Sequence, residues 1–341
     1  DAPGPLDKVD YIPTQRFGPR RVRGEPGWFG ADYSSSLGGV SIPVLAHENG
    51  QWCAYPDYDV ISKFTGYLRP GNFEIFRGSL AARGMLHKNK DFAWASGRFQ
   101  LACYKEEIEA NLRTPGLVGF QLLDLHDYIG QGTALVGLLD PFWEEKGYVT
   151  AAEFRRFCSP TVPLARLRQR VYTTGDSFNA DVEIAHYGPA ALSNAVAAWR
   201  VVDDAGAVVA RGEWEPRDIP IGKSFRLGTV KLDLTQLTAP RAYRLVVTVR
   251  SANPGSAWAP NEVENDWQFW LYPQRMPESV PADVLVTSSW PEAEARLASG
   301  GKVLFTPRNA DLHWTSPPLA EVPVFWNRLM NPGWSRMLGL W

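Results

Sequence analysis

The chain has 341 residues, of which 45% are hydrophobic and 21% charged, and its formal net charge is −2 at pH 7. This composition is typical of a globular protein with room for two or three domains. The near-neutral charge argues against a nucleic-acid or anionic-membrane partner, and no apolar run approaches the ~20 residues of a membrane span.

Residues 1–39 are dense in Pro, Gly, Arg and Ser and have no helix or strand periodicity, so we expect a long loop there. The first regular element is predicted at Ile42 to Ala46. This apolar run is typical of a strand buried on both faces, and Gly50 and Pro56 prevent it from continuing.

Polar and aromatic side chains follow this strand closely. They are His47, Glu48, Asn49, Gln51, Trp52 and Tyr55. A carboxylate beside amides, an imidazole and aromatic rings suits a sugar, whose hydroxyls and C–H faces these groups can bind. The alternative is that Glu48 is an ordinary residue of a solvated loop.

Three helices are predicted between this strand and the next one. A short helix spans Asp59 to Thr65, and a second runs from an Asn72 cap to Arg83, where Gly84 ends it. A longer helix covers Asp91 to Leu112, with apolar residues at spacings near 3.6. Its charged residues are expected on an exposed side. They are Lys105, Glu106, Glu107 and Glu109.

A second buried strand is predicted from Leu117 to Leu123, followed by a glycine-punctuated loop. The polar residues of this stretch are Gln121, Asp124, His126 and Asp127. A helix between two parallel strands makes a crossover, which puts both strand ends at one edge of the sheet. A metal site at Asp124 to Asp127 would lack a third fixed ligand, so we predict no metal and no cofactor. Thr150 then caps a last helix, Ala151 to Phe157.

The hydrophobic period changes to two from about residue 166 to 273. About seven short strands, with a hairpin turn at Asp203 to Gly206, predict an immunoglobulin-like β-sandwich. After Pro281, a strand, a helix at Pro291 to Ala298 and a strand from Lys302 form one β-α-β unit. Too few residues follow for a complete doubly wound domain.

Three segments resemble the C-terminal half of glycoside hydrolase family 2 enzymes, in particular large bacterial members often labelled β-galactosidase. The segments are Ile42 to Tyr58, Tyr104 to Gly116 and Gly119 to Gly132. The resemblance extends over about residues 40–275. It implies that Glu48, after a strand like the seventh of the barrel, is the catalytic nucleophile, and that Gly119 to Gln131 corresponds to the eighth strand and its loop.

The resemblance implies a multidomain chain. Residues 1–164 would be the C-terminal part of a (β/α)8 barrel, 165–275 the sandwich and 282–341 a partial α/β domain. The activity would be that of a retaining exo-β-glycosidase acting on a terminal sugar, in a bacterial periplasmic or secreted protein. The sugar would be bound by residues of both strand ends. They are His47, Asn49, Gln51, Trp52, Tyr55, Gln121, Asp124, His126, Asp127 and Gln131.

One feature departs from the family pattern. The family's acid/base Glu, in an Asn-Glu pair after the fourth strand, should lie upstream of Glu48, but residues 1–47 contain no Asn-Glu pair. We therefore expect an N-terminal polypeptide that completes the barrel to be a partner, and no hydrolysis by this chain alone. The competing interpretation is a non-catalytic carbohydrate-binding or structural fragment.

Overall fold

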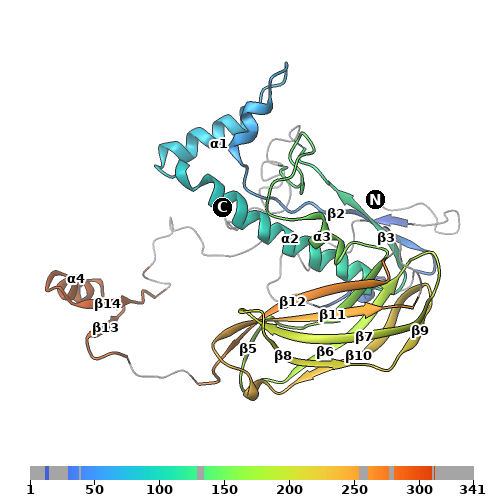
Figure 1. The fold of residues 1–341 in the computed structure, drawn as a ribbon. Helices are drawn as coiled ribbons and strands as arrows, with labels where there is room; N and C mark the ends of the chain where they lie inside the picture. The colour runs from blue at the N-terminus through green and yellow to red at the C-terminus, as the bar shows by residue number, and fades with distance from the viewer. Residues whose placement is uncertain are drawn as a thin grey trace.

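The computed structural model describes residues 12–14, 30–37, 40–128, 134–252, 260–275, 280–308 and 311. Strands dominate these residues. They form one parallel sheet of three strands, one antiparallel sheet of three strands, one mainly antiparallel sheet of six strands and a parallel pair near the C-terminus (Figure 1). None of the helices in the described ranges is both long enough and apolar enough to cross a membrane.

The parallel sheet has the order β1 (Ile12–Thr14), β2 (Val44–Gly50) and β3 (Leu117–Leu123). The sequence predicted the second and third strands, although the second begins and ends later than expected. The expectation of a loop over residues 1–39 was wrong at β1, which pairs in parallel with the first residues of β2. A three-residue strand is too short to show a period, and η2 (Ser34–Ser36) adds a single 3-10 turn.

Four helical segments connect the second and third strands. They are η3 (Tyr58–Lys63), α1 (Gly71–Ala82), η4 (Leu86–Lys88) and α2 (Asn89–Arg113). The first α-helix starts before Asn72, and Pro70 occupies the cap position without a side-chain hydrogen bond. Gly84 ends this helix as predicted, with a φ of 67° and its N–H bonded to the carbonyl of Ala81.

The long helix α2 differs from its prediction in what surrounds it. Its carboxylates Glu106, Glu107 and Glu109 are only 9%, 1% and 0% exposed, so the expected solvated face is wrong. The helix contacts β2 and β3 on one side and the antiparallel strands β6 and β10 on another, which leaves little of this part for water (Figure 1). Charged residues predict exposure only where no second layer covers them.

The antiparallel part contains nine strands. They are β4 (Thr161–Arg166), β5 (Val171–Thr173), β6 (Phe178–His186), β7 (Leu192–Asp203), β8 (Val208–Glu213), β9 (Arg217–Ile219), β10 (Gly222–Leu232), β11 (Arg241–Arg250) and β12 (Glu262–Tyr272). One sheet has the order β10-β6-β4 and the other β5-β12-β11-β7-β8, with β9 paired to β7. Alternate residues of both sheets form one buried core, as the period of two predicted.

Two local predictions in this half are confirmed. Thr150 accepts a hydrogen bond of 3.1 Å from the Glu153 N–H at the start of α3 (Ala151–Arg155). The turn between β7 and β8 uses Asp203, whose Oδ1 accepts from two backbone N–H groups, and Gly206 with a φ of 83°. A 3-10 turn, η6 (Leu234–Gln236), precedes β11.

The C-terminal unit consists of β13 (Val284–Thr287), α4 (Trp290–Ala298) and β14 (Lys302–Phe305). Its two strands pair in parallel, as a β-α-β connection requires. Trp290 of the helix packs edge-on against Phe305, with ring centroids 5.5 Å apart. The predicted β-α-β unit is therefore confirmed as far as the structure describes it.

Candidate active site

The middle strand of the parallel sheet contains a β-bulge. Ala46 pairs with Phe120 and Asn49 with Leu122, so two residues of β2 lie opposite the single residue Gln121 of β3. Those two residues are His47 and Glu48. Bulges redirect side chains and are common beside active sites. Glu48 therefore lies within β2 at the bulge, and not in a loop after the strand as the sequence suggested.

The backbone at this bulge is in an unusual conformation. Glu48 has a φ of 53° and Gln51 a φ of 65°. Both values lie in the left-handed region of backbone conformation, which residues other than glycine seldom adopt. Gly50 between them has a φ of 97°, and a Cβ at this position would lie 2.3 Å from the ring of Tyr104. Such conformations persist only where surrounding contacts enforce them, and they cluster at functional sites.

The Glu48 carboxylate is held from two sides. Gln51 donates a hydrogen bond of 3.0 Å from Nε2 to Oε2, and the His47 Nε2 lies 3.6 Å from Oε1. The other ring nitrogen of His47 is 2.8 Å from the amide oxygen of Gln121, which fixes the imidazole. The Glu48 side chain keeps 28% of its surface exposed. It is thus both oriented and accessible to a small molecule.

Several residues predicted to bind sugar are buried behind this carboxylate. Asn49, Gln51 and Trp52 are 4%, 2% and 1% exposed. The indole Nε1 of Trp52 donates 2.8 Å to Oε2 of Glu107, so this ring has no open face for a ligand. Tyr55 is half-buried, and its hydroxyl lies 2.8 Å from that of Tyr58. These four residues support the site from within.

The end of β3 brings a second polar group to the same edge. Gly50 pairs with Leu123, so Asp124 lies one residue beyond this pair. The Asp124 Oδ2 is 3.3 Å from Nδ1 of His126, and the two side chains are 30% and 26% exposed. This half of the predicted cluster is therefore accessible, and it adjoins the bulge through strand pairing.

Asp127 has a different environment from its neighbours. It is 6% exposed, and its Oδ1 accepts from the Gly137 N–H at 2.9 Å and from Lys146 Nζ at 2.7 Å. Burial raises the pKa of Asp127 above the usual carboxyl value, although Lys146 acts in the opposite direction. The carboxylate anchors the loop after β3. Gln131 lies outside the described residues.

An aromatic residue that the sequence analysis did not select completes the accessible group. The Trp143 ring stacks on His126 with centroids 4.4 Å apart and an interplanar angle of 22°. It is 60% exposed, and its φ of 67° is again in the left-handed region. A stacked, exposed indole can receive the C–H face of a sugar ring. The sequence did not indicate Trp143 because this residue lies well beyond the ends of both predicted strands.

No cluster of three or more potential metal ligands occurs within the part of the chain that the structure describes. All three cysteines are free thiols, and burial raises the pKa of Cys158 to about 11. The polar side chains that the structure places at this edge are carboxylates, imidazoles and amides.

Comparisons with known proteins give limited matches. A family model described as "Domain of unknown function (DUF8488)" matches residues 176–273, within the antiparallel sheets. None of the curated proteins matches the sequence.

Solved structures that resemble the chain include glycoside hydrolases. The β-glucuronidase of Parabacteroides merdae is 17% identical over 29% of this chain and 12% of its own, with a TM-score of 0.22. The exo-chitosanase CsxA of Amycolatopsis orientalis is 11% identical over 62% of this chain and 24% of its own, with a TM-score of 0.34. A CARDB domain from Pyrococcus furiosus is 14% identical over 33% of this chain and 92% of its own, with a TM-score of 0.22. The chain thus spans 12% to 24% of the two enzymes, and these similarities assign neither fold nor function.

Proposed function

We propose that this chain carries the nucleophile and part of the sugar-binding surface of a retaining exo-β-glycosidase that resembles β-galactosidase. In this proposal, β1 to β3 and the helices between them, over residues 1–164, are the C-terminal part of a (β/α)8 barrel. Residues 165–275 are an immunoglobulin-like sandwich, and 282–341 are part of an α/β domain. A carbohydrate is the substrate.

The observation that carries the proposal is the geometry of Glu48. The Glu48 carboxylate lies in a left-handed bulge, is oriented by Gln51 and His47 and is still 28% exposed, and strained backbone of this kind clusters at functional sites. In retaining glycosidases one carboxylate attacks the anomeric carbon and forms a covalent glycosyl-enzyme, which water then hydrolyses. Glu48 is suited to that role.

The second carboxyl group of such a mechanism lies roughly 5–5.5 Å from the nucleophile, where it protonates the leaving oxygen and later activates water. An N-terminal polypeptide that completes the barrel would supply this group. Asp124 is the alternative within this chain, because it is accessible and follows the strand that pairs with β2. Asp127 is less suitable because Lys146 and Gly137 already occupy its carboxylate.

Sugar hydroxyls would be bound by the polar groups at the same edge. These are His47, Gln121, Asp124 and His126, with Gln51 orienting the nucleophile and Trp143 supplying a ring face. Asn49, Trp52 and Tyr55 would act through the backbone that they hold. Gln131 keeps its predicted role as a sugar ligand.

A second function is favoured by one specific observation, the exposed Trp143 ring that stacks on His126, because such a ring face binds a sugar whether or not a reaction follows. In this alternative the chain binds carbohydrate, or serves as a structural fragment, without turnover. A test must therefore detect the nucleophile without requiring the acid/base residue.

Activated 2-deoxy-2-fluoro-β-glycosyl fluorides meet that requirement, because fluoride departs without protonation. The carboxylate oxygen bonds to C1 as the C–F bond breaks, and a stable glycosyl ester remains. We would incubate the full chain with galactosyl, glucosyl and glucuronyl probes, alone and with the N-terminal polypeptide, and locate the added mass by peptide mapping. Labelling of Glu48, and its loss in Glu48→Gln at an unchanged melting temperature, is the expected result. Sugar binding without labelling in either preparation would overturn the proposed glycosidase activity and favour the non-catalytic binding fragment.

A further inference from the structure

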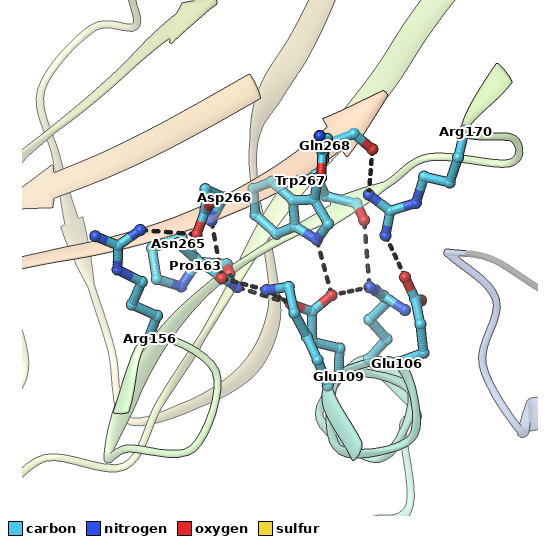
Figure 2. A network of polar contacts seen from close by, with 12 residues as sticks. Glu106, Glu109, Arg156, Pro163, Arg170, Asn265, Asp266, Trp267 and Gln268 are labelled. Carbon is cyan, nitrogen blue, oxygen red and sulfur yellow. Dashed lines mark hydrogen bonds and ion pairs between the residues drawn. The ribbon is translucent and has the colours of Figure 1, made fainter. Parts of the chain in front are cut away.

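The helix α2 directs carboxylates to two different neighbours. Glu106 and Glu109 face the antiparallel sheets, as Figure 2 shows. Oε1 of Glu109 accepts 2.9 Å from Asn265 and Oε2 accepts 2.9 Å from the indole of Trp267, while Glu106 forms an ion pair with Arg170. Since all three partners belong to β12 or to the segment before β5, this face of the helix is fixed to the sandwich.

Glu109 is also tied to its own helix. Burial alone would raise the pKa of Glu109, but the neighbouring charges of Lys105 and Arg113 outweigh it and hold the pKa below the usual value. Arg113 in turn donates to the carbonyl of Ala165 in β4, at 3.3 Å. The end of α2 thus rests on several charge-assisted bonds, which are stronger than bonds between neutral groups.

The opposite side of the same turns faces the bulge. Glu107 accepts two hydrogen bonds at a single oxygen, Oε2, from the Gly50 N–H at 3.1 Å and from the Trp52 indole at 2.8 Å. One turn further, Asn111 donates 2.9 Å to the side-chain oxygen of Asn49. These contacts reach three of the four residues that follow Glu48, namely Asn49, Gly50 and Trp52.

A bulge with two left-handed residues does not maintain itself, because each such conformation is strained relative to ordinary strand backbone. The Gly50 N–H lies between the two left-handed residues, so a buried acceptor for this group opposes a return to regular strand geometry.

We propose that Glu107 is a positioning residue that holds the Glu48 carboxylate in its reactive orientation, through Gly50 and Trp52. The inference rests on the proposed function of Glu48. The sandwich contributes by fixing α2, the helix on which Glu107 lies. Glu107 itself is 1% exposed and does not touch substrate.

The test measures how fast Glu48 is labelled by the glycosyl fluoride that labels the wild-type preparation best. Glu107→Leu removes the acceptor at similar size, Glu107→Gln keeps an acceptor oxygen, and Trp52→Phe removes one of the two donors. Glu106→Gln is the matched control, since it changes the adjacent buried carboxylate on the sandwich side, where Glu109 and Arg113 still hold α2 to β12 and β4. Melting temperatures are recorded for all variants, and ¹⁵N-labelled tryptophan reports the Trp52 indole N–H by NMR.

We expect Glu107→Leu to lower the maximal labelling rate by roughly 10–100-fold, in line with the cost of a displaced reacting group, with little change in the probe concentration for half-maximal rate. Glu107→Gln should restore most of this rate, and Trp52→Phe should fall between. Glu106→Gln should label at the wild-type rate, whatever its melting temperature.

Two outcomes would overturn the inference. One is a Glu107→Leu variant that folds, shows a shifted Trp52 indole signal and labels at the wild-type rate. The other is a loss of rate that Glu106→Gln reproduces in proportion to its loss of stability, which would make the effect one of general folding. If Glu107→Leu does not fold, Trp52→Phe carries the same comparison. Failure of wild-type Glu48 to label with any probe would instead count against the proposed function.

Discussion

The side-chain amide of Asn111 donates a hydrogen bond of 2.9 Å to Oδ1 of Asn49, the residue that follows Glu48. The two asparagines are 62 positions apart in the chain, and both are almost completely buried. The last turn of α2 and the bulge of β2 are therefore joined at the residue next to the candidate nucleophile. Packing of the helix against the sheet therefore helps to fix the backbone of the site.

Removal of the Trp143 ring should weaken sugar binding without affecting the reaction of Glu48. In Trp143→Ala, we expect kcat/KM of the active assembly on an oligosaccharide to fall by roughly 10–1,000-fold, or ~1.4–4 kcal/mol, because the stacking face is lost. The decrease in kcat/KM for His126→Ala and for Asp124→Ala should lie within the same range, since the His126 imidazole supports the Trp143 ring. Steady-state kinetics measure the effect, and unchanged kinetics with a lower melting temperature would make this group structural.

Gly50→Ala should destabilise the fold by about 2–4 kcal/mol, because the new Cβ requires both a strained φ and displacement of a buried ring. That Cβ would lie 2.3 Å from Tyr104, which is 0% exposed. Gly71→Ala is the matched control, since a Cβ added there, at the start of α1, would have no neighbour within 4 Å. Urea denaturation should find this control within ~1 kcal/mol of the wild type. Equal stability of the two variants would contradict the prediction.

Glu109→Gln should cost about 3–5 kcal/mol of unfolding free energy, because it leaves the buried guanidinium of Arg113 without its counter-charge. Asp91→Asn, in the first turn of the same helix, breaks an exposed ion pair with Lys88 of η4 and should cost at most ~1 kcal/mol. The native pKa of Glu109 is lowered, so its contribution is present above the ordinary value of 4.5 and is lost as pH falls below it. Denaturation at pH 7 and at pH 3 should therefore show a smaller difference between wild type and Glu109→Gln at the lower pH.

The environment of Lys223 predicts that the unfolding free energy rises with pH in the alkaline range. Its Nζ donates to the carbonyls of Asn111, at 3.2 Å, and Leu117, and burial lowers its pKa to about 8 in spite of nearby Glu183. An unfolded lysine titrates near 10.5, so between these two values the unfolded chain binds more protons and the unfolding free energy rises with pH.

The measurement compares wild type with Lys223→Met from pH 7 to pH 10. The stability of the wild type relative to the variant should rise above pH 8, by at most ~1.4 kcal/mol per pH unit for a single proton. A difference that stays constant over this range would contradict the lowered pKa.

Much of the architecture could be predicted because each element has its own local signal. The apolar run of β2, the 3.6-residue spacing of α2 and the alternation in β11 follow from which side chains are buried. The apolar run of β3 also predicted a strand, but the expected burial was wrong, since only Leu117 is buried and Val118 is 56% exposed. Polar residues at the ends of β2 and β3 were predicted to lie at one edge of the sheet, and the pairing of Gly50 with Leu123 brings Asp124 next to the end of β2.

The remaining features depend on contacts between distant residues. The burial of Glu107 and Glu109 could not be predicted, because a carboxylate is buried only where donors such as Trp52 and Trp267 come from other elements. The bulge was also missed, since it is defined by the register between β2 and β3. Trp143 joins the site only through its stack on His126, 17 residues away by number.

The bulge makes the direction of the Glu48 side chain depend on a count of residues. Side chains of a regular strand alternate between two faces, so a shift of one position reverses every side chain that follows. Deletion of His47 or Glu48 would leave one residue opposite Gln121 and keep the pairs Ala46–Phe120 and Asn49–Leu122, so the bulge and its left-handed position would be lost. Insertions and deletions at this point should therefore be far less tolerated than substitutions, and libraries that vary the length of this segment would show its tolerance directly.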